Sequence, residues 1–290
     1  MPVLFFLFQV EISARESSLK PFYKKVIEIL ASDSLQGREV STIYEDKAAD
    51  YITDQFENFR SFKTHRQYFQ FTNPENGRML LSKNIYCYID HHASKTILIS
   101  AHYDHIGLGG SKSLSYHNQG QVHHGADDNA SGVALMLGLA KNFKHWRNKK
   151  YNYLFVAYSA HEVGLFGSSS FKKFAEKQFK HIILVMNFDM VGRLDSKERI
   201  LSVYGYSSLA KKDDFFRQTP KNIKYSIDEN DKVIQTDAGT FASSGVYALS
   251  FTTGIHEDYH KISDEARYIN LDGIEVIQHL LEQFLDQWSL

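Results

Sequence analysis

The sequence places two adjacent carboxylates, Asp127 and Asp128, in a short turn-forming segment at residues 125–132. Acidic side chains in a tight turn contribute little to a hydrophobic core, but they are good ligands for a hard or borderline cation. Gly and Asn tolerate the backbone angles of such a turn, and Ser131 is placed to cap the helix that follows. Taken alone, the segment fits a capped loop as well as a metal site, so the segments around it must decide.

Histidine and carboxylate side chains also follow four predicted strands, each near the end of its strand. They are His102 and Asp104 after strand 96–100, His161 and Glu162 after strand 153–158, Asp189 after strand 182–187, and the segment 256–260 after strand 247–252. Side chains beyond the carboxyl ends of neighbouring parallel strands meet in one crevice. These ligands are nitrogen and oxygen atoms without thiolate, which is typical of catalytic zinc. Together these segments supply a set of His, Asp, Glu, Asp and His. Three carboxylates and two imidazoles are too many for one ion with an open position, so the set predicts two ions that share a bridging carboxylate and a water.

The elements that would position these residues alternate along the chain. The predicted helices are 20–31, 44–59, 131–143, 168–179, 207–217 and 271–288, and the predicted strands are 68–71, 84–89, 96–100, 153–158, 182–187, 200–204 and 247–252. Such alternation predicts an α/β fold, a single-domain three-layer sandwich with a mixed, mainly parallel β-sheet flanked by helices. Residues 1–18 are expected to be an N-terminal segment, either a remnant signal or a packing strand. Residues 19–290 are expected to form the catalytic domain without an inserted second domain.

Composition excludes several classes of function. The chain has 290 residues, of which 43% are hydrophobic, enough for a sizeable core. Its net charge of −1 gives no global field that would attract nucleic acid. No apolar run approaches the roughly 20 residues of a membrane span, and the single cysteine, Cys87, is expected to be a buried thiol. The apolar N-terminus favours a secreted or periplasmic protein over a cytoplasmic one.

The polar segments resemble those of peptidase family M28, the co-catalytic di-zinc aminopeptidases. The matching segments, in the family's order, are 100–104, 125–132, 161–168, 187–192 and 259–264, and residues 33–38 are similar to the family's Leu-x-Gly-Arg loop. The likeness runs from about residue 19 to the C-terminus. It implies a zinc-exopeptidase fold and the removal of N-terminal residues from peptides that have a free N-terminus.

The resemblance also implies a role for each site residue. Two zinc ions would be held by five ligands, which are His102, Asp128, Glu162, Asp189 and His260. His102 and Asp189 would bind one ion, Glu162 and His260 the other, and Asp128 would bridge them. Asp104 would hold an imidazole in one tautomer, and Asp127 would be a neighbour of the bridge.

One position departs from the family pattern. Two consecutive glutamates usually precede the Gly-Leu-x-Gly segment, and the first is the general base; here His161 stands in that place, before the ligand Glu162. A neutral imidazole accepts a proton, and its ordinary pKa of about 6.5 suits the task, although two nearby dications would lower that pKa. The sequence therefore allows an active peptidase with His161 as base, a weak one, or a metal-binding relative without turnover.

Other interpretations remain open at this stage. Residues 256–260 match H-E-x-x-H, the single-zinc metalloprotease motif, which works only on a helix, and no amphipathic helix is predicted there. A glutaminyl-cyclase-like acyltransferase would use a single zinc, whereas the presence of both His102 and Asp189 favours two. A carboxypeptidase would need an Arg for the free carboxylate, and none is obviously placed. His117, His123 and His124 lie in a glycine-containing loop that is either an extra metal site or a solvated loop.

Overall fold

The structure is a computed structural model and describes residues 18–59, 63–116, 120–143, 149–179, 181–205, 223–228, 235–242 and 246–288. The described strands form one eight-stranded sheet in the order β1-β2-β4-β3-β5-β8-β6-β7. Residues 1–17, the predicted helix 207–217 and His117 lie outside the described residues.

The sheet is mixed, with a parallel centre. The strands are β1 (Thr64–Thr72), β2 (Met79–Ile89), β3 (Thr96–His102), β4 (Asn152–Tyr158), β5 (Ile182–Phe188), β6 (Ile200–Tyr204), β7 (Lys224–Asp228) and β8 (Tyr247–Thr252). Strands β4, β3, β5 and β8 run parallel to one another, while β2 joins β1 and β4 in antiparallel pairs and β6 joins β8 likewise. All four central strands therefore end at the same edge of the sheet, as the sequence predicts.

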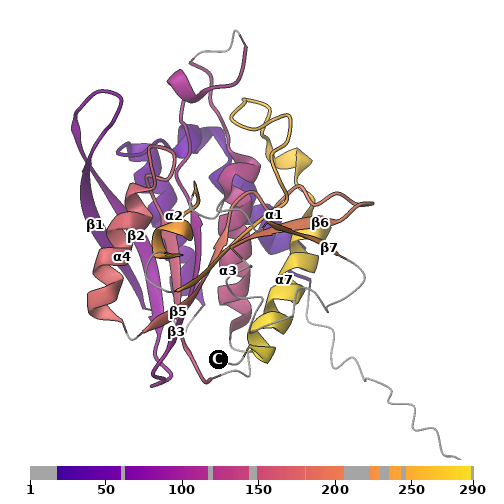
Figure 1. The fold of residues 1–290 in the computed structure, drawn as a ribbon. Helices are drawn as coiled ribbons and strands as arrows, with labels where there is room; N and C mark the ends of the chain where they lie inside the picture. Colours follow the sequence, from indigo (N-terminus) through magenta and orange to yellow (C-terminus); the bar gives the residue numbers. More distant parts are fainter. Residues whose placement is uncertain are drawn as a thin grey trace, which may run out of the picture.

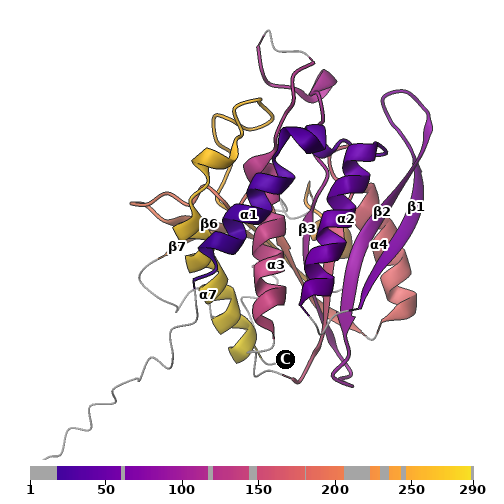
Figure 2. The same cartoon turned by 180° about the vertical axis from the view of Figure 1, so that it is seen from behind.

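Helices cover both faces of this sheet. One face carries α1 (Lys20–Leu30), α2 (Ile43–Asn58), α3 (Gly132–Asn142) and α7 (Leu271–Gln287), as Figure 2 shows from behind. The other face carries α4 (Phe166–Gln178), which lies in front of the sheet in Figure 1, and the short α6 (Gly239–Ala242). The predicted three-layer sandwich is confirmed.

Burial on both faces explains the composition of the central strands. Every residue of β3, β4 and β5 is buried, which requires the nearly continuous apolar runs that the sequence shows. Cys87 in β2 is fully buried, as predicted. None of the described helices has the length and hydropathy needed to cross a bilayer.

Two elements of the structure are absent from the sequence prediction. Strand β7 is a five-residue strand at the edge of the sheet, and α6 is a single turn of four residues. The four residues of α6 are too few to display the helical period, whereas β7 is absent from the prediction although it is as long as β6.

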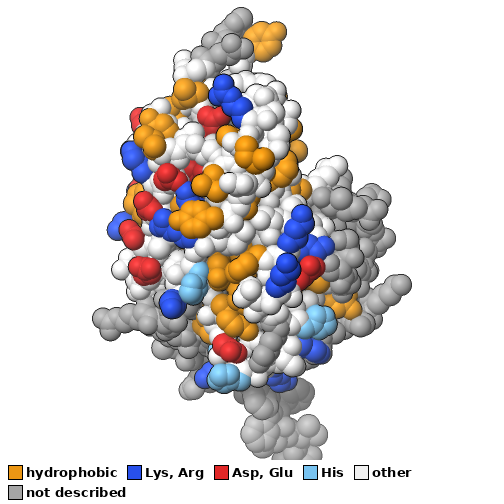
Figure 3. Space-filling model, turned by 90° about the vertical axis from the view of Figure 1, so that its left-hand side faces the viewer, with side chains coloured by type: hydrophobic (Ala, Val, Ile, Leu, Met, Phe, Trp, Pro, Cys, Tyr) orange, Lys and Arg blue, Asp and Glu red, His pale blue; other side chains and the backbone are white. Residues whose placement is uncertain are grey.

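On the side where β1 and β2 lie, the surface is not dominated by charged side chains of one sign. Figure 3 shows basic and acidic side chains interspersed there with exposed apolar ones. Three of the exposed apolar side chains belong to the β1–β2 hairpin, namely Tyr68, Met79 and Leu81. This mixture agrees with the net charge of −1.

We expect Phe155→Ala to lower the free energy of unfolding by about 3–5 kcal/mol, because the substitution leaves a cavity in the core. Phe155 is fully buried in β4 and its ring packs against Phe56 and Phe143. Met79→Ala is the control, since that side chain is 64% exposed and its removal should change stability by no more than about 0.5 kcal/mol. Urea denaturation measures both, and equal losses in the two variants would contradict this description of the core.

Candidate metal centre

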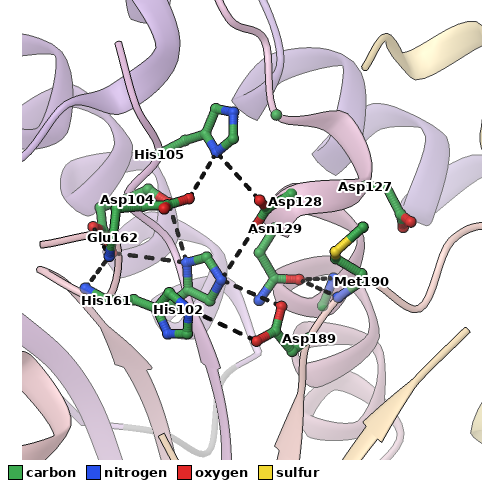
Figure 4. Close-up of polar contacts among 12 residues, drawn as sticks. His102, Asp104, His105, Asp127, Asp128, Asn129, His161, Glu162, Asp189 and Met190 are labelled. Carbon is green, nitrogen blue, oxygen red and sulfur yellow. Dashed lines mark hydrogen bonds and ion pairs between the residues drawn. The ribbon is translucent and has the colours of Figure 1, made fainter. Parts of the chain in front are cut away.

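The carboxyl edge of the central strands gathers all five residues expected to bind metal. Figure 4 shows four of them, namely His102, Asp128, Glu162 and Asp189. His102 is the last residue of β3, Asp189 directly follows β5 and Glu162 comes shortly after β4. Asp128 belongs to η3 (Ala126–Ser131), the turn before α3, and His260 lies between β8 and α7. Residues up to 158 positions apart in the sequence, counted from His102 to His260, thus share one cluster.

The carboxylate of Asp128 lies between two imidazoles. Its Oδ1 is 3.3 Å from Nε2 of His102, and its Oδ2 is 3.2 Å from Nε2 of His260. On the first side, His102 Nε2 is also 3.5 Å from Oδ1 of Asp189. On the second side, His260 Nε2 is 3.2 Å from Oε2 of Glu162. The cluster therefore has two halves that share one carboxylate.

These distances fit two zinc ions. Ligand atoms that surround one ion tetrahedrally at about 2.0–2.1 Å lie about 3.3 Å from each other, and the four contacts span 3.2–3.5 Å. The Nε2 atoms of His102 and His260 are buried and have no hydrogen-bond partner. Buried polar atoms without partners are costly, and a cation would satisfy both.

The electrostatics of the cluster lead to the same interpretation. Burial would lower the pKa of His260, but its contacts with Asp128 and Glu162 raise it to about 10. Burial would raise the pKa of Asp128, but His102 and His260 hold it well below its ordinary value. The carboxylates thus create a strongly negative site that attracts protons or metal ions to the same positions.

His105 belongs to the cluster although the sequence analysis did not select it. It is 1% exposed, and its Nδ1 lies 3.0 Å from Oε1 of Glu162 and 3.8 Å from Oδ2 of Asp128. A signal was present, since His105 directly follows Asp104 beyond the same strand.

Asp104 ties the ends of two strands together. Its carboxylate accepts hydrogen bonds from the backbone N–H groups of His161 (3.1 Å) and Glu162 (3.2 Å). Nδ1 of His102 is 3.2 Å from the backbone carbonyl oxygen of Asp104 and 3.8 Å from its carboxylate. Burial raises the pKa of Asp104 to about 6. The expected action on the imidazole thus involves the carbonyl more closely than the carboxylate.

His161 occupies its expected place but has a partner that the sequence did not indicate. Its Nδ1 is 2.9 Å from Oδ2 of Asp237, and its Nε2 is 3.9 Å from Oδ2 of Asp189. Asp237 is fully buried and comes from the turn before α6, 76 residues along the chain. No predicted strand precedes Asp237, so the pattern of strand ends could not find it.

The acidic turn is held by the loop that follows His260. The carboxylate of Asp264 accepts hydrogen bonds from the backbone N–H groups of Asp127 and Asp128, each at 3.0 Å. At Gly125, which has a φ of 58°, a β-carbon would lie 2.3 Å from the carbonyl oxygen of Asp128. Only glycine fits that position, because any side chain would displace the backbone of Asp128.

Asp127 faces away from the cluster (Figure 4). Its Oδ1 accepts hydrogen bonds from Gly192 N and from Ser131 Oγ, and its Oδ2 is 3.1 Å from Nε2 of His256. The expectation that Ser131 caps α3 is wrong, because its hydroxyl makes no cap hydrogen bond and instead donates to Asp127. Asn129 caps the start of α3 instead, because its Oδ1 accepts a hydrogen bond from Gly132 N.

The H-E-x-x-H segment does not form a helix. Residues 257–260 form a turn, and of the two histidines His260 faces Asp128 while His256 faces Asp127. The two imidazoles therefore cannot share one helix face, which excludes the single-zinc metalloprotease arrangement.

The histidines of the 108–124 loop that the structure describes are engaged elsewhere. Nε2 of His123 is 2.8 Å from Ser113 Oγ, and Nε2 of His124 is 2.9 Å from Asp33. His123 and His124 therefore do not come together as ligands of an additional metal site.

Three residues of the site adopt the left-handed backbone region that non-glycine residues avoid. They are Ala160 (φ 56°), Met190 (φ 57°) and His260 (φ 53°). Each such residue costs about 1–3 kcal/mol, and such strain gathers where function requires it. Ala160 directly precedes His161 and Met190 directly follows Asp189, so the strained positions direct the side chains of the cluster.

A cavity of ≈ 310 Å³ opens beside the cluster. Asp128, His161, Glu162 and Asp189 contribute to its wall. The rest of the lining is Met190, Tyr204, Gln235, Thr236, Ser250, Thr252, Gly254, Ile255 and Tyr259. A small organic molecule in this cavity would contact the cluster on one side and largely neutral side chains on the other.

A buried arginine joins the acidic turn to the end of β3. Arg38, the last residue of η1 (Asp33–Arg38), is fully buried. Its guanidinium donates hydrogen bonds to the backbone carbonyl oxygens of Tyr103 (2.8 Å), His124 (2.7 Å) and Gly125 (3.0 Å). Burial lowers its pKa to about 10, so the side chain stays charged at neutral pH.

Comparison with known proteins identifies relatives of this arrangement. The family model of peptidase family M28 matches residues 84–285. Among curated proteins, the alkaline phosphatase isozyme conversion protein of Escherichia coli is 29% identical over 160 residues, which are 53% of this chain and 46% of that protein. Aminopeptidase YwaD of Bacillus subtilis is 26% identical over 191 residues, 62% of this chain and 38% of that protein. The chain thus spans less than half the length of these relatives.

Solved structures share the fold at low sequence identity. A glutaminyl cyclase of Bacteroides thetaiotaomicron has a TM-score of 0.78 and 15% identity, with 95% of this chain and all of that chain covered. A leucine aminopeptidase precursor of the same organism also has a TM-score of 0.78, at 14% identity, with 95% and 99% covered.

We expect Arg38→Met to destabilise the protein by about 3 kcal/mol or more, because it leaves several buried carbonyl oxygens without donors. Arg66→Met is the matched control. Arg66 pairs with Asp50 at the surface, and exposed pairs contribute about 0–1 kcal/mol. Urea denaturation measures both variants. A loss of stability in Arg38→Met no greater than that in Arg66→Met would contradict the role of Arg38 in joining the acidic turn to the end of β3.

Proposed function

Because the chain belongs to peptidase family M28, we propose that it is a zinc-dependent aminopeptidase that removes N-terminal residues from peptides. The carboxylate of Asp128, placed between the imidazoles of His102 and His260, carries this proposal. Each imidazole nitrogen has a further carboxylate beside it, Asp189 in one half and Glu162 in the other. Both halves of the cluster are thus furnished with ligands, which supports two ions.

A zinc pair supplies an acidified water and a polarised scissile carbonyl when it is bound. The chain's own residues would orient the substrate and handle the proton. The cavity beside the cluster would receive the N-terminal side chain, and the clustered carboxylates would attract the free amine. A peptide without a charged N-terminus would lack that attraction, which supports cleavage at the chain end.

His161 would be the proton acceptor. It lies at the wall of the cavity beside Glu162 and Asp189, with 17% of its side chain exposed. The imidazole would take a proton from the attacking water and later give it to the departing amine, so that one proton moves in each direction per turnover. The new C–O bond forms first as water adds to the carbonyl carbon, the C–N bond then breaks as the amine takes the proton, and no further reactant is required.

We expect the purified protein to hold two zinc ions per chain and to hydrolyse aminoacyl fluorogenic amides. A chelator should abolish this hydrolysis, and Asp128→Ala should lose zinc and activity together, because both ions would share that carboxylate. Zinc analysis measures the metal content, and a panel of aminoacyl fluorogenic amides measures the hydrolysis. Asp195→Ala is the control and should keep both properties, because this exposed carboxylate accepts hydrogen bonds from the backbone N–H groups of Lys197 and Glu198.

Two results would overturn this function. Hydrolysis that continues unchanged with chelator would exclude a metal mechanism. One zinc per chain, with cyclisation of N-terminal glutaminyl peptides and no hydrolysis, would instead indicate the glutaminyl-cyclase-like alternative.

We expect His161→Ala to lower kcat by about 10²–10⁴-fold, the usual contribution of a general base, with zinc content unchanged. His161→Glu should keep more of the activity than His161→Ala, since a carboxylate also accepts a proton. Steady-state kinetics on one aminoacyl amide compare the three proteins. If the alanine variant keeps full kcat, His161 is not the base.

A further inference from the structure

His161 is held on two sides by buried groups. Its Nδ1 faces Oδ2 of Asp237 at 2.9 Å, the distance of a charge-assisted hydrogen bond. Its ring stacks on that of His102, with the ring centroids 3.8 Å apart and the ring planes 7° from parallel. The two contacts together fix both the rotation and the plane of the imidazole.

The contact with Asp237 selects a tautomer. A carboxylate oxygen accepts a hydrogen bond, so the Nδ1 that faces it carries the proton. In the neutral ring the lone pair then lies on Nε2, the atom directed toward Asp189. The buried carboxylate thus determines which nitrogen is available at the cavity wall.

The stacking argues that His161 is not a metal ligand beside His102. A zinc ion lies about 2.0–2.1 Å from an imidazole nitrogen, in the plane of the ring. The lone pairs of two rings that are nearly parallel and 3.8 Å apart do not converge on one point so close to both. If His102 is a metal ligand, Nε2 of His161 therefore stays available as a proton acceptor.

We propose that Asp237 is a positioning residue that holds His161 in the Nδ1–H tautomer, so that Nε2 is the atom that accepts the proton. This inference rests on the proposed function. When His161 takes the proton, the ring becomes an imidazolium, and the carboxylate of Asp237 2.9 Å away stabilises the new charge. The proton leaves again with the departing amine, and Asp237 keeps its own charge throughout.

The same contact allows a prediction for a glutamate at position 161. A glutamate at position 161 would bring a second carboxylate toward the fully buried Asp237, and like charges in a buried site repel strongly. Asp237 therefore suits a histidine at position 161 and opposes a glutamate.

The tautomer is measured directly by ¹⁵N NMR of histidine-labelled, zinc-loaded protein at a pH at which the His161 ring is neutral, with His161→Gln to assign the signal. We expect Nδ1–H for His161 in the wild type and a shift toward Nε2–H in Asp237→Ala. An Nε2–H tautomer in the wild type, or an unchanged spectrum in the variant, would overturn the proposal. This measurement needs no enzymatic activity, so it separates a failure of this inference from a failure of the proposed function.

Kinetics give the second test. We expect Asp237→Asn to lower kcat about 10–100-fold, the usual effect of an outer residue that orients a catalytic one, with KM within about twofold and zinc content unchanged. Thr240→Val is the matched control, because Thr240 Oγ1 donates to the backbone oxygen of Asp237 and secures the same turn without touching the carboxylate's charge. An equal loss in the control would assign the effect to the turn and overturn the proposal.

A double variant gives the sharpest contrast. Asp237→Asn should lower kcat when residue 161 is histidine, but should raise it in the His161→Glu background, because there it removes the repulsion between two carboxylates. A loss of the same size in both backgrounds would show that Asp237 does not act through His161.

Discussion

Repulsion among buried carboxylates is the constraint on which the rest of this structure depends. Asp128, Glu162 and Asp189 converge at one edge of the sheet, with side-chain exposures of 4%, 7% and 18%. Charges removed from water are costly unless they are paired. Here the pairing is with imidazoles, whose raised pKa values show how strongly the site attracts positive charge. Zinc ions would take the place of those protons, since a metal ligand must be deprotonated.

Such a cluster persists only if its surroundings prevent it from opening. Arg38 ties the acidic turn to β3, Asp264 holds the two backbone N–H groups of that turn, and Asp104 joins the ends of β3 and β4. Each of these three charged groups is buried and acts on backbone atoms. These three buried charges therefore fix the backbone around the cluster, and the side chains of the cluster itself can bind metal.

Local patterns in the sequence predicted most of the architecture, while the five proposed ligands came from the resemblance of its polar segments to family M28. Fully buried strands have long apolar runs, and the residue after such a strand lies at a known edge of the sheet. The role of Ser131 was mispredicted because a capping sequence does not reveal a competing acceptor such as Asp127. Asp237 was missed because its importance arises from a contact 76 residues away. Contacts of that kind are set by the packing of the whole sheet and leave no local pattern.

The central claim is that Asp128 bridges two metal ions. The most direct test is a crystal structure of the zinc-loaded protein with anomalous data collected at the zinc edge. Our account predicts two anomalous peaks on opposite sides of the Asp128 carboxylate, one beside His102 and Asp189 and one beside Glu162 and His260. A single peak, or two peaks that do not share Asp128, would contradict it.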